Sequence, residues 1–337
     1  MSKNSSILKY VIKRLLLALF ILIGVSLILY ILIRLMPLNV IEANYYKTHT
    51  KGDAADEAQL AEILARYNLD DKSFGGICKG WWNWITKFFS GDLGRTLTNN
   101  RDVGEVIFEN MGVSFAVSLI SLVLELIIAI PLGIKCACNQ YGKLDYTVTV
   151  LTMIGISFPS FFFASIIIKI FAVDLGWFPI NGLNTPTANY TGIMNILDMA
   201  WHMILPIFVL TILSIGSMMR HTRTNTLEVL NADYIRTARA KGLSEGKVVY
   251  KHAFRNTLIP LVTTLAGILP GLFGGSMIVE QVFALPGIGN MAYKLTQTGD
   301  VTFIMGYDMF IATLTVIGIL LTDIMYAVVD PRVRLGK

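Results

Sequence analysis

Acidic side chains and histidines are the first candidates for chemistry in this chain of 337 residues. Glu125 and Asp323 lie inside long apolar runs, where a carboxylate is costly and typically marks a transport pathway or a proton relay. Two isolated acids do not make a relay, so we expect internal pairing or a cavity-lining, bundle-interior role for both. The histidines at positions 49, 202, 221 and 252 have no spaced carboxylate or cysteine partner. The sequence therefore predicts no catalytic site and no enzyme activity.

A second candidate for chemistry is the stretch Gly-Leu-Ser-Glu-Gly-Lys at residues 242–247, which faintly resembles a phosphate-binding loop. It has too few residues between its glycines, and Val248 stands where a Ser or Thr is needed. We therefore expect this chain to bind no ATP and no other cofactor. The three cysteines lack the further ligands that a metal site requires, so no metal site is expected either.

Apolar runs dominate the chain and must position these side chains. Hydrophobic residues make up 54% of the sequence and charged residues 15%, which is too apolar for a soluble domain of this length. Six runs are long enough to cross a bilayer as helices. They lie at residues 15–33, 113–134, 147–173, 200–219, 258–283 and 306–329. The prediction is an all-α membrane protein with six transmembrane helices.

The distribution of Lys and Arg predicts how these helices are oriented. Basic residues precede the first run, lie between the second and third, and follow the last run, whereas residues 174–199 contain none. Because short cytoplasmic loops carry an excess of Lys and Arg, both termini are predicted to be cytoplasmic in a multi-pass protein. Residues 37–110 then form a long extracytoplasmic segment.

Two helices are predicted within residues 37–110. Asp53 is a plausible N-cap for an amphipathic helix over residues 54–67. Residues 81–89 place four aromatic or aliphatic side chains on one face, which is typical of a helix at the water-lipid boundary or packed against the bundle. Substrate binding by this aromatic cluster is the alternative.

Prolines and glycines interrupt the apolar runs more often than a plain anchor requires. Pro131, Pro159, Pro206 and Pro270 are expected to bend their helices. Gly267, Gly271 and Gly275 recur every four residues and predict a face on which a second helix packs closely.

The most polar segment inside the membrane part is the loop at residues 220–257. Between positions 220 and 255 it carries eight Lys or Arg residues and three acids, so it is predicted to be cytoplasmic. Asn231 is expected to cap a short helix over residues 232–241, Gly242 to end it in the left-handed region, and Ser244 to cap a second helix. The loop could dock a partner, satisfy the positive-inside rule or contact anionic membrane lipid. A DNA-binding helix-turn-helix is disfavoured by the flanking spans, so nucleic acid is not an expected partner.

The sequence of this loop resembles a known family. Ala-Asp-Tyr-Ile-Arg-Thr-Ala-Arg-Ala-Lys-Gly-Leu at residues 232–243 resembles the coupling loop of ABC importer permeases in the oligopeptide/dipeptide/nickel branch. Further signatures of that branch follow in its order at residues 156–161, 175–179, 202–206, 280–289 and 330–334. The long segment after the first helix resembles the B-type member of the permease pair. The general importer loop has Glu-Ala-Ala where this chain has Arg236, Thr237 and Ala238, a departure that the peptide branch shares.

The resemblance implies the type I ABC importer permease fold in a bacterial or archaeal cell (inner) membrane. It implies a permease subunit of an ATP-driven peptide importer that works with a second homologous permease, two ATPase subunits and an extracytoplasmic binding protein. ATP and magnesium would be bound by the ATPase subunits. The loop residues that would meet the ATPase are Asp233, Tyr234, Arg236, Ala238, Arg239, Ala240, Lys241, Gly242 and Leu243.

The predicted organisation has four parts. Residues 1–36 form the N-terminus and first transmembrane helix, and 37–110 the extracytoplasmic segment. Residues 111–331 form a five-helix permease core containing the coupling loop 220–257, and 332–337 form the tail. Alternatives are an ion-driven carrier or channel whose basic loop binds lipid, or a structural anchor. Nickel or another small solute remains an alternative to peptides as the substrate.

Overall fold

The computed structural model describes residues 3–35, 42–43, 45–47, 49–66, 71, 73–186, 188, 190–257, 261 and 268–329. The regular secondary structure of the described part is helical, apart from one isolated β-bridge between Arg95 and Asp102; turns and irregular segments connect the helices. Its long helices are α1 (Lys3–Leu35), α5 (Val103–Cys138), α8 (Ile193–Leu230) and α15 (Val301–Val329). The shorter elements are α3 (Ala54–Arg66), α4 (Phe74–Phe89), α6 (Lys143–Ser157), α7 (Ser160–Ile167), η1 (Ile168–Asp174), α9 (Asp233–Ala240), α10 (Glu245–Lys247), η2 (Val248–Ala253), α12 (Ile268–Gly274), α13 (Met277–Val282) and α14 (Ile288–Gln297).

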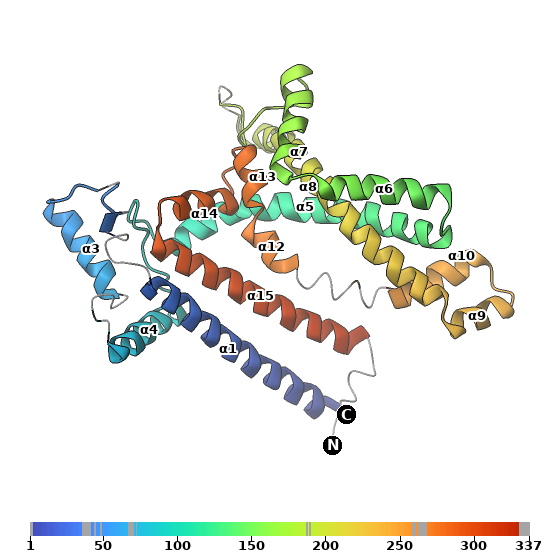
Figure 1. Ribbon diagram of the computed structural model, residues 1–337, viewed down its shortest axis with the longest axis horizontal. Helices are drawn as coiled ribbons and strands as arrows, with labels where there is room; N and C mark the ends of the chain where they lie inside the picture. The colour runs from blue at the N-terminus through green and yellow to red at the C-terminus, as the bar shows by residue number, and fades with distance from the viewer. Residues whose placement is uncertain are drawn as a thin grey trace.

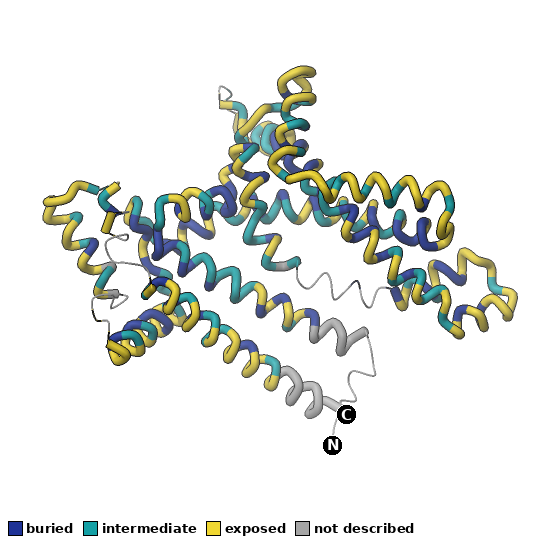
Figure 2. The backbone as a smooth tube through the Cα atoms, viewed as in Figure 1, coloured by how far each residue is buried: buried dark blue, intermediate teal, exposed yellow. Residues whose placement is uncertain are grey.

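The helices form an elongated bundle with two distinct ends (Figure 1). Helices α3 and α4 lie at one end, which we call the α3 end, and α9 and α10 lie at the other, the α9 end. Helices α5 and α8 run side by side along the bundle, and α1 lies beside α15. Many residues on the outer surfaces of these long helices are exposed, as expected for helices that face lipid (Figure 2).

Four of the predicted membrane spans are present as single helices. Ile12–Leu35, Val103–Cys138, Ile193–Leu230 and Val301–Thr322 are long and apolar enough to cross a membrane. The predicted third span is instead the pair α6 and α7–η1, bent by 102°. Pro159 causes this break, because proline lacks an N–H and forces Phe158 into an extended conformation (ψ 130°).

The predicted fifth span, residues 258–283, is only partly described. Residues 258–260 and 262–267 lie outside the described part, so the Gly267 position of the glycine pattern is not described either. The remainder is not one helix, because α12 ends at Gly274 and α13 starts at Met277. Gly275 between them has φ +72°, a left-handed conformation that glycine adopts readily. The predicted fifth span is therefore not one continuous helix in its C-terminal half.

Close helix approach occurs at glycines other than those predicted. A Cβ atom on Gly271 would meet nothing within 4 Å, and Gly275 lies outside any helix. Instead, a Cβ on Gly133 of α5 would lie 2.7 Å from Cβ of Thr222 on α8. A Cβ on Gly216 of α8 would likewise lie 2.8 Å from a side-chain carbon of Ile156 on α6. These two glycines let α8 pack closely against both neighbours.

The helices at the α3 end pack onto the bundle. Helix α3 begins after Asp53, whose Oδ1 accepts from the Ala55 N–H at 2.8 Å, so the predicted N-cap is confirmed. On α4, Trp84 and Ile85 are buried in a cluster with residues of α1 and α15. The indole of Trp81 donates to Ser26 Oγ of α1 at 3.1 Å. Of the two positions predicted for the aromatic face, packing against the bundle is the one observed.

A buried ion pair joins α6 to α8 near the α9 end. Arg223 Nε and Nη2 each donate to one carboxylate oxygen of Asp145 at 2.6 Å. Asp145 is 4% exposed and also accepts from the Tyr141 N–H at 3.0 Å. Because the geometry is bidentate and the acid is buried, this pair is far more constrained than a surface salt bridge. It fixes the α9 end of α8 against α6.

Removing one partner of this pair is expected to destabilise the protein more than removing both. Arg223→Met leaves the Asp145 carboxylate buried and unpaired, at a cost of about 3 kcal/mol. The double variant Arg223→Met/Asp145→Asn removes the unpaired charge and should recover much of that loss. Thermal unfolding of the purified variants in detergent measures both effects. Equal stability of the single variant and the unaltered protein would contradict the assigned role.

Candidate translocation cavity and coupling hairpin

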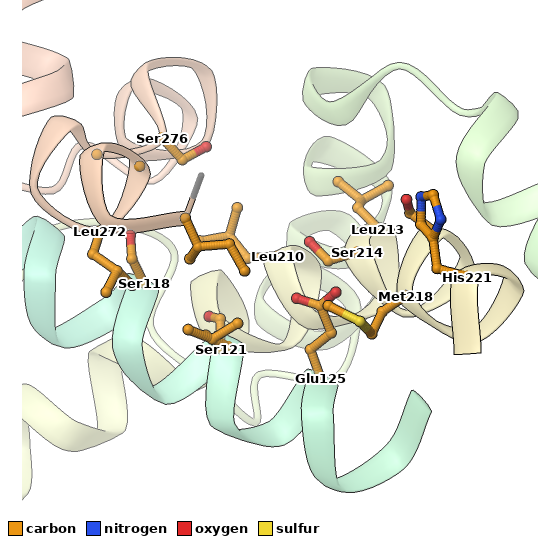
Figure 3. Close-up of a pocket in the computed structure, with 15 residues that line it drawn as sticks. Ser118, Ser121, Glu125, Leu210, Leu213, Ser214, Met218, His221, Leu272 and Ser276 are labelled. Carbon is orange, nitrogen blue, oxygen red and sulfur yellow. The ribbon is translucent and has the colours of Figure 1, made fainter. Parts of the chain in front are cut away.

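A cavity of about 520 Å³ lies between α5, α8 and α12. Its lining combines leucine side chains with the hydroxyl groups of serines on α5 and α8, and Ser276 lies at one side (Figure 3). Hydroxyl groups beside apolar side chains can contact both polar and apolar parts of a solute. The cavity runs along the same helix, α8, that leads to the loop at the α9 end.

Glu125 is the acidic residue in the lining of this cavity. Its carboxylate points into the cavity from α5 (Figure 3). It has no hydrogen-bond or ion-pair partner within the described part of the chain, so it is placed to line the cavity rather than to pair internally. His221, which the sequence gave no reason to select, also lines the cavity. Asp323 lies in α15, but its side chain is outside the described part.

One wall of the cavity is held by a buried carboxylate that sequence reasoning missed. Glu280 on α13 is 2% exposed. Its Oε1 accepts from Ser114 Oγ of α5 at 2.7 Å and from the Ser276 N–H at 3.1 Å, while Oε2 accepts from the Asn290 N–H at 3.0 Å. Ser114 Oγ in turn accepts from the Ile288 N–H at 2.9 Å. This network, which we call the Glu280 network, ties α13 and α14 to α5.

Glycines make room for the Glu280 carboxylate. A Cβ atom added to Gly275 or to Gly287 would lie 2.3 Å from one of its oxygens. A Cβ on Gly289 would lie 2.9 Å away. These glycines explain the run Pro-Gly-Ile-Gly that follows Glu280 in the sequence. The close approach places backbone N–H groups within hydrogen-bonding distance of the acid, which compensates its burial.

The loop at the α9 end forms a helical hairpin, residues 233–253, which we call the coupling hairpin. Gly242 follows α9 with φ +76°, so the predicted left-handed turn is confirmed. The predicted Asn231 cap is wrong: α8 continues to Leu230, and Asn231 ends α8, with its side chain donating to the Leu227 carbonyl at 3.0 Å. Ala232 occupies the N-cap position of α9 instead. Ser244 precedes α10 in the N-cap position but makes no side-chain capping bond.

Helix α9 has an inner and an outer face. Ile235 and Ala238 are buried against Val248 and Ala253 of η2. Ala238 therefore packs within this chain. Its burial does not support the prediction that it contacts an ATPase subunit. Leu243 is partly buried in the same cluster. The inner face explains how so polar a helix is held in place.

The outer face carries most of the residues selected from the sequence. The selected residues that are exposed are Asp233, Tyr234, Arg236, Arg239, Ala240, Lys241 and Gly242. The Arg236 side chain is 72% exposed and lies 3.6 Å from Asp233, a weak surface pair. Arg239 donates to Glu245 at 2.8 Å and so closes the hairpin on itself. The hairpin thus presents a mixed, mostly basic surface on a fixed backbone.

If the cavity is open to water, its lining should react with a polar thiol reagent. In a variant without native cysteines, we expect Ser214→Cys on α8 to be modified rapidly by a charged methanethiosulfonate. Val209→Cys, on the same helix but fully buried in the core, should remain unmodified and is the matched control. Mass spectrometry measures the labelling, and equal protection of both cysteines would contradict a water-accessible cavity.

Comparison with known proteins identifies the family. The family described as "binding-protein-dependent transport system inner membrane component" matches residues 129–335. The oligopeptide transport system permease protein AppB of Bacillus subtilis is 35% identical over 96% of this chain and 99% of its own length. The oligopeptide transport system permease protein OppB of Haemophilus influenzae is 33% identical over 97% of this chain and 99% of its own.

A solved structure of the MetNI methionine ABC transporter, in inward-facing conformations, aligns with a TM-score of 0.46 and 20% identity, covering 69% of this chain and 96% of that chain. The family match extends over most of the chain and includes the cavity-lining part of α8, the coupling hairpin and every member of the Glu280 network except Ser114. This chain belongs to the binding-protein-dependent transport system inner membrane components.

Proposed function

We propose that this chain is a permease subunit of an ATP-driven peptide importer and forms half of the translocation path. The observation that carries the proposal is the coupling hairpin, whose charged outer face is exposed while its inner face is fixed by Ile235 and Ala238. Similarity over nearly the whole length to relatives named as oligopeptide permeases supports peptides as the substrate class.

The proposed complex contains a second homologous permease, two ATPase subunits and an extracytoplasmic binding protein. We place both termini and the α9 end in the cytoplasm, since the basic residues concentrate there. ATP and magnesium are bound by the ATPase subunits, and hydrolysis occurs on those chains. Membrane lipid surrounds the exposed apolar faces of α1 and α5.

Movement at the ATPase reaches the cavity through α8. This single helix of 38 residues ends next to the coupling hairpin and lines the cavity along its middle. A helix transmits a displacement as a rigid rod, and the Arg223–Asp145 pair makes α6 move with it. Closure of the ATPase pair on ATP would thereby alternate the direction in which the cavity opens.

The cavity lining suits a substrate with variable side chains. Serine hydroxyl groups can donate to and accept from peptide groups, and the leucines contact side chains without selecting one of them. Nickel is the alternative substrate that the resemblance leaves open. Uptake of labelled dipeptides, oligopeptides and nickel by cells that depend on this system distinguishes the substrates.

The proposed coupling is tested by co-purification. Gly242→Asp forces a side chain into the left-handed conformation and should break the hairpin turn, so the ATPase chains are lost from the complex and uptake stops. Gly246→Asp is the matched control, because Gly246 has no positive φ and nothing within 4 Å of an added Cβ. Pull-down in mild detergent with an ATPase assay measures both variants. Retention of the ATPases and normal uptake with Gly242→Asp would refute docking through this hairpin.

The role of Glu125 distinguishes the importer from the ion-driven alternative. In an ATP-driven importer, Glu125 lines the cavity but relays no protons. The Glu125→Gln variant should therefore retain ATP-driven uptake, and an ionophore should not abolish that uptake. Glu105→Gln, on the same helix but exposed outside the cavity, is the matched control. Measured uptake that collapses with the proton gradient and with Glu125→Gln alone would instead support an ion-driven carrier.

A further inference from the structure

A second pocket lies at the α3 end of the bundle and is lined by other residues than the cavity. It has a volume of about 250 Å³, and its walls come from α3, from the end of α4, from the segment 92–102 and from the first turn of α15. Its lining shares no residue with the cavity or with the coupling hairpin. Its lining is polar throughout, unlike the apolar surroundings of the membrane helices.

Hydrogen bonds hold the walls of this pocket in place. Asp300 is buried, and its Oδ2 accepts from the Leu97 N–H at 2.6 Å and from the Thr98 N–H at 3.2 Å. Its Oδ1 accepts from the Phe303 N–H at 3.0 Å and caps α15. A bond from the Val103 N–H to the Gly94 carbonyl at 2.9 Å closes the segment. The pocket is therefore held in shape by long-range hydrogen bonds.

Two buried polar atoms in the lining have no partner within the described residues. Thr302 is 1% exposed, yet its hydroxyl oxygen makes no hydrogen bond. The side-chain nitrogen of Gln59 is also buried without an acceptor. Both residues line the pocket. Because buried polar groups are nearly always satisfied, these two atoms require partners that the described residues do not supply, either water or a bound molecule.

Charges of both signs line the same pocket: Lys87 and Arg95 are cationic, and Glu62, Asp92 and Asp102 are acidic. The Lys87 side chain makes no hydrogen bond or ion pair within the described part, and Arg95 donates from its side chain to the Asn100 carbonyl at 3.1 Å. Glu62 is likewise unpaired there, and Asp102 accepts from the Glu105 N–H. Cations and carboxylates held apart around one small volume are complementary to a molecule that carries both a carboxylate and an ammonium group.

We propose that this pocket binds a small zwitterion, a free amino acid or a dipeptide. The ligand carboxylate would accept from Lys87, Arg95 and the orphaned hydroxyl of Thr302. Its ammonium group would donate to Glu62 and Asp102. The pocket volume admits a molecule of that size but not a folded segment of another protein. This inference does not depend on the proposed transport function, because it uses none of the residues of the cavity.

Equilibrium dialysis of the purified full-length protein with radiolabelled alanyl-alanine tests the proposal. We expect saturable binding that weakens about tenfold in Thr302→Val, which is isosteric, and more in Lys87→Met. Lys79→Met, an exposed lysine of α4 outside the pocket, should bind as the unaltered protein does. N-acetyl-alanyl-alanine and alanyl-alanine amide, which each lack one charge, should bind at least about tenfold more weakly.

Three outcomes would overturn the proposal. No saturable binding would mean that the pocket holds water only. Equal binding of the blocked dipeptides would exclude recognition of a zwitterion. Binding lost in Glu125→Gln but unchanged in Thr302→Val and Lys87→Met would place the dipeptide in the membrane cavity instead. ATPase co-purification and uptake are measured separately, so failure here is distinguishable from failure of the importer assignment.

Discussion

The buried carboxylate of Glu280 is the constraint on which the architecture around the cavity depends. An acid placed among apolar helices must be surrounded by hydrogen-bond donors, and this one accepts from Ser114, Ser276 and Asn290. Those donors belong to α5, to the break before α13 and to α14. The chain between α12 and α13 is therefore fixed against α5, and the cavity between α5, α8 and α12 keeps a defined wall.

Different contacts connect this wall to the two ends of the bundle. Toward the α9 end, α8 joins the cavity to the coupling hairpin, with close packing at Gly133 and Gly216 and an ion pair at Arg223. Toward the α3 end, Asp300 joins the segment 92–102 to α15. A displacement of the coupling hairpin can thus reach the cavity through one helix, while the α3 end presents a preformed polar surface.

The sequence predicted what depends on local chemistry and missed what depends on distant contacts. Apolar runs predicted the helical membrane fold, Asp53 the start of α3, and Gly242 the turn of the hairpin. The prediction that Asn231 caps the start of α9 was wrong, because α8 continues to Leu230 and Asn231 is the C-cap of α8. The Glu280 network could not be seen, since Ser114 lies 166 residues away in the sequence. Local patterns also cannot tell which face of α9 is buried, so the packing of Ala238 against η2 was not foreseen.

Site-specific photo-crosslinking in the membrane tests whether the coupling hairpin docks an ATPase subunit. Tyr234 is an exposed aromatic side chain on the outer face of α9, and a benzoylphenylalanine there preserves much of its shape. Docking through this hairpin predicts an ultraviolet-dependent adduct between this position and an ATP-hydrolysing subunit, and none from the same probe at Phe20, which is exposed on α1. An adduct to lipid alone from position 234, with the ATPases present in the membrane, would contradict docking through the coupling hairpin.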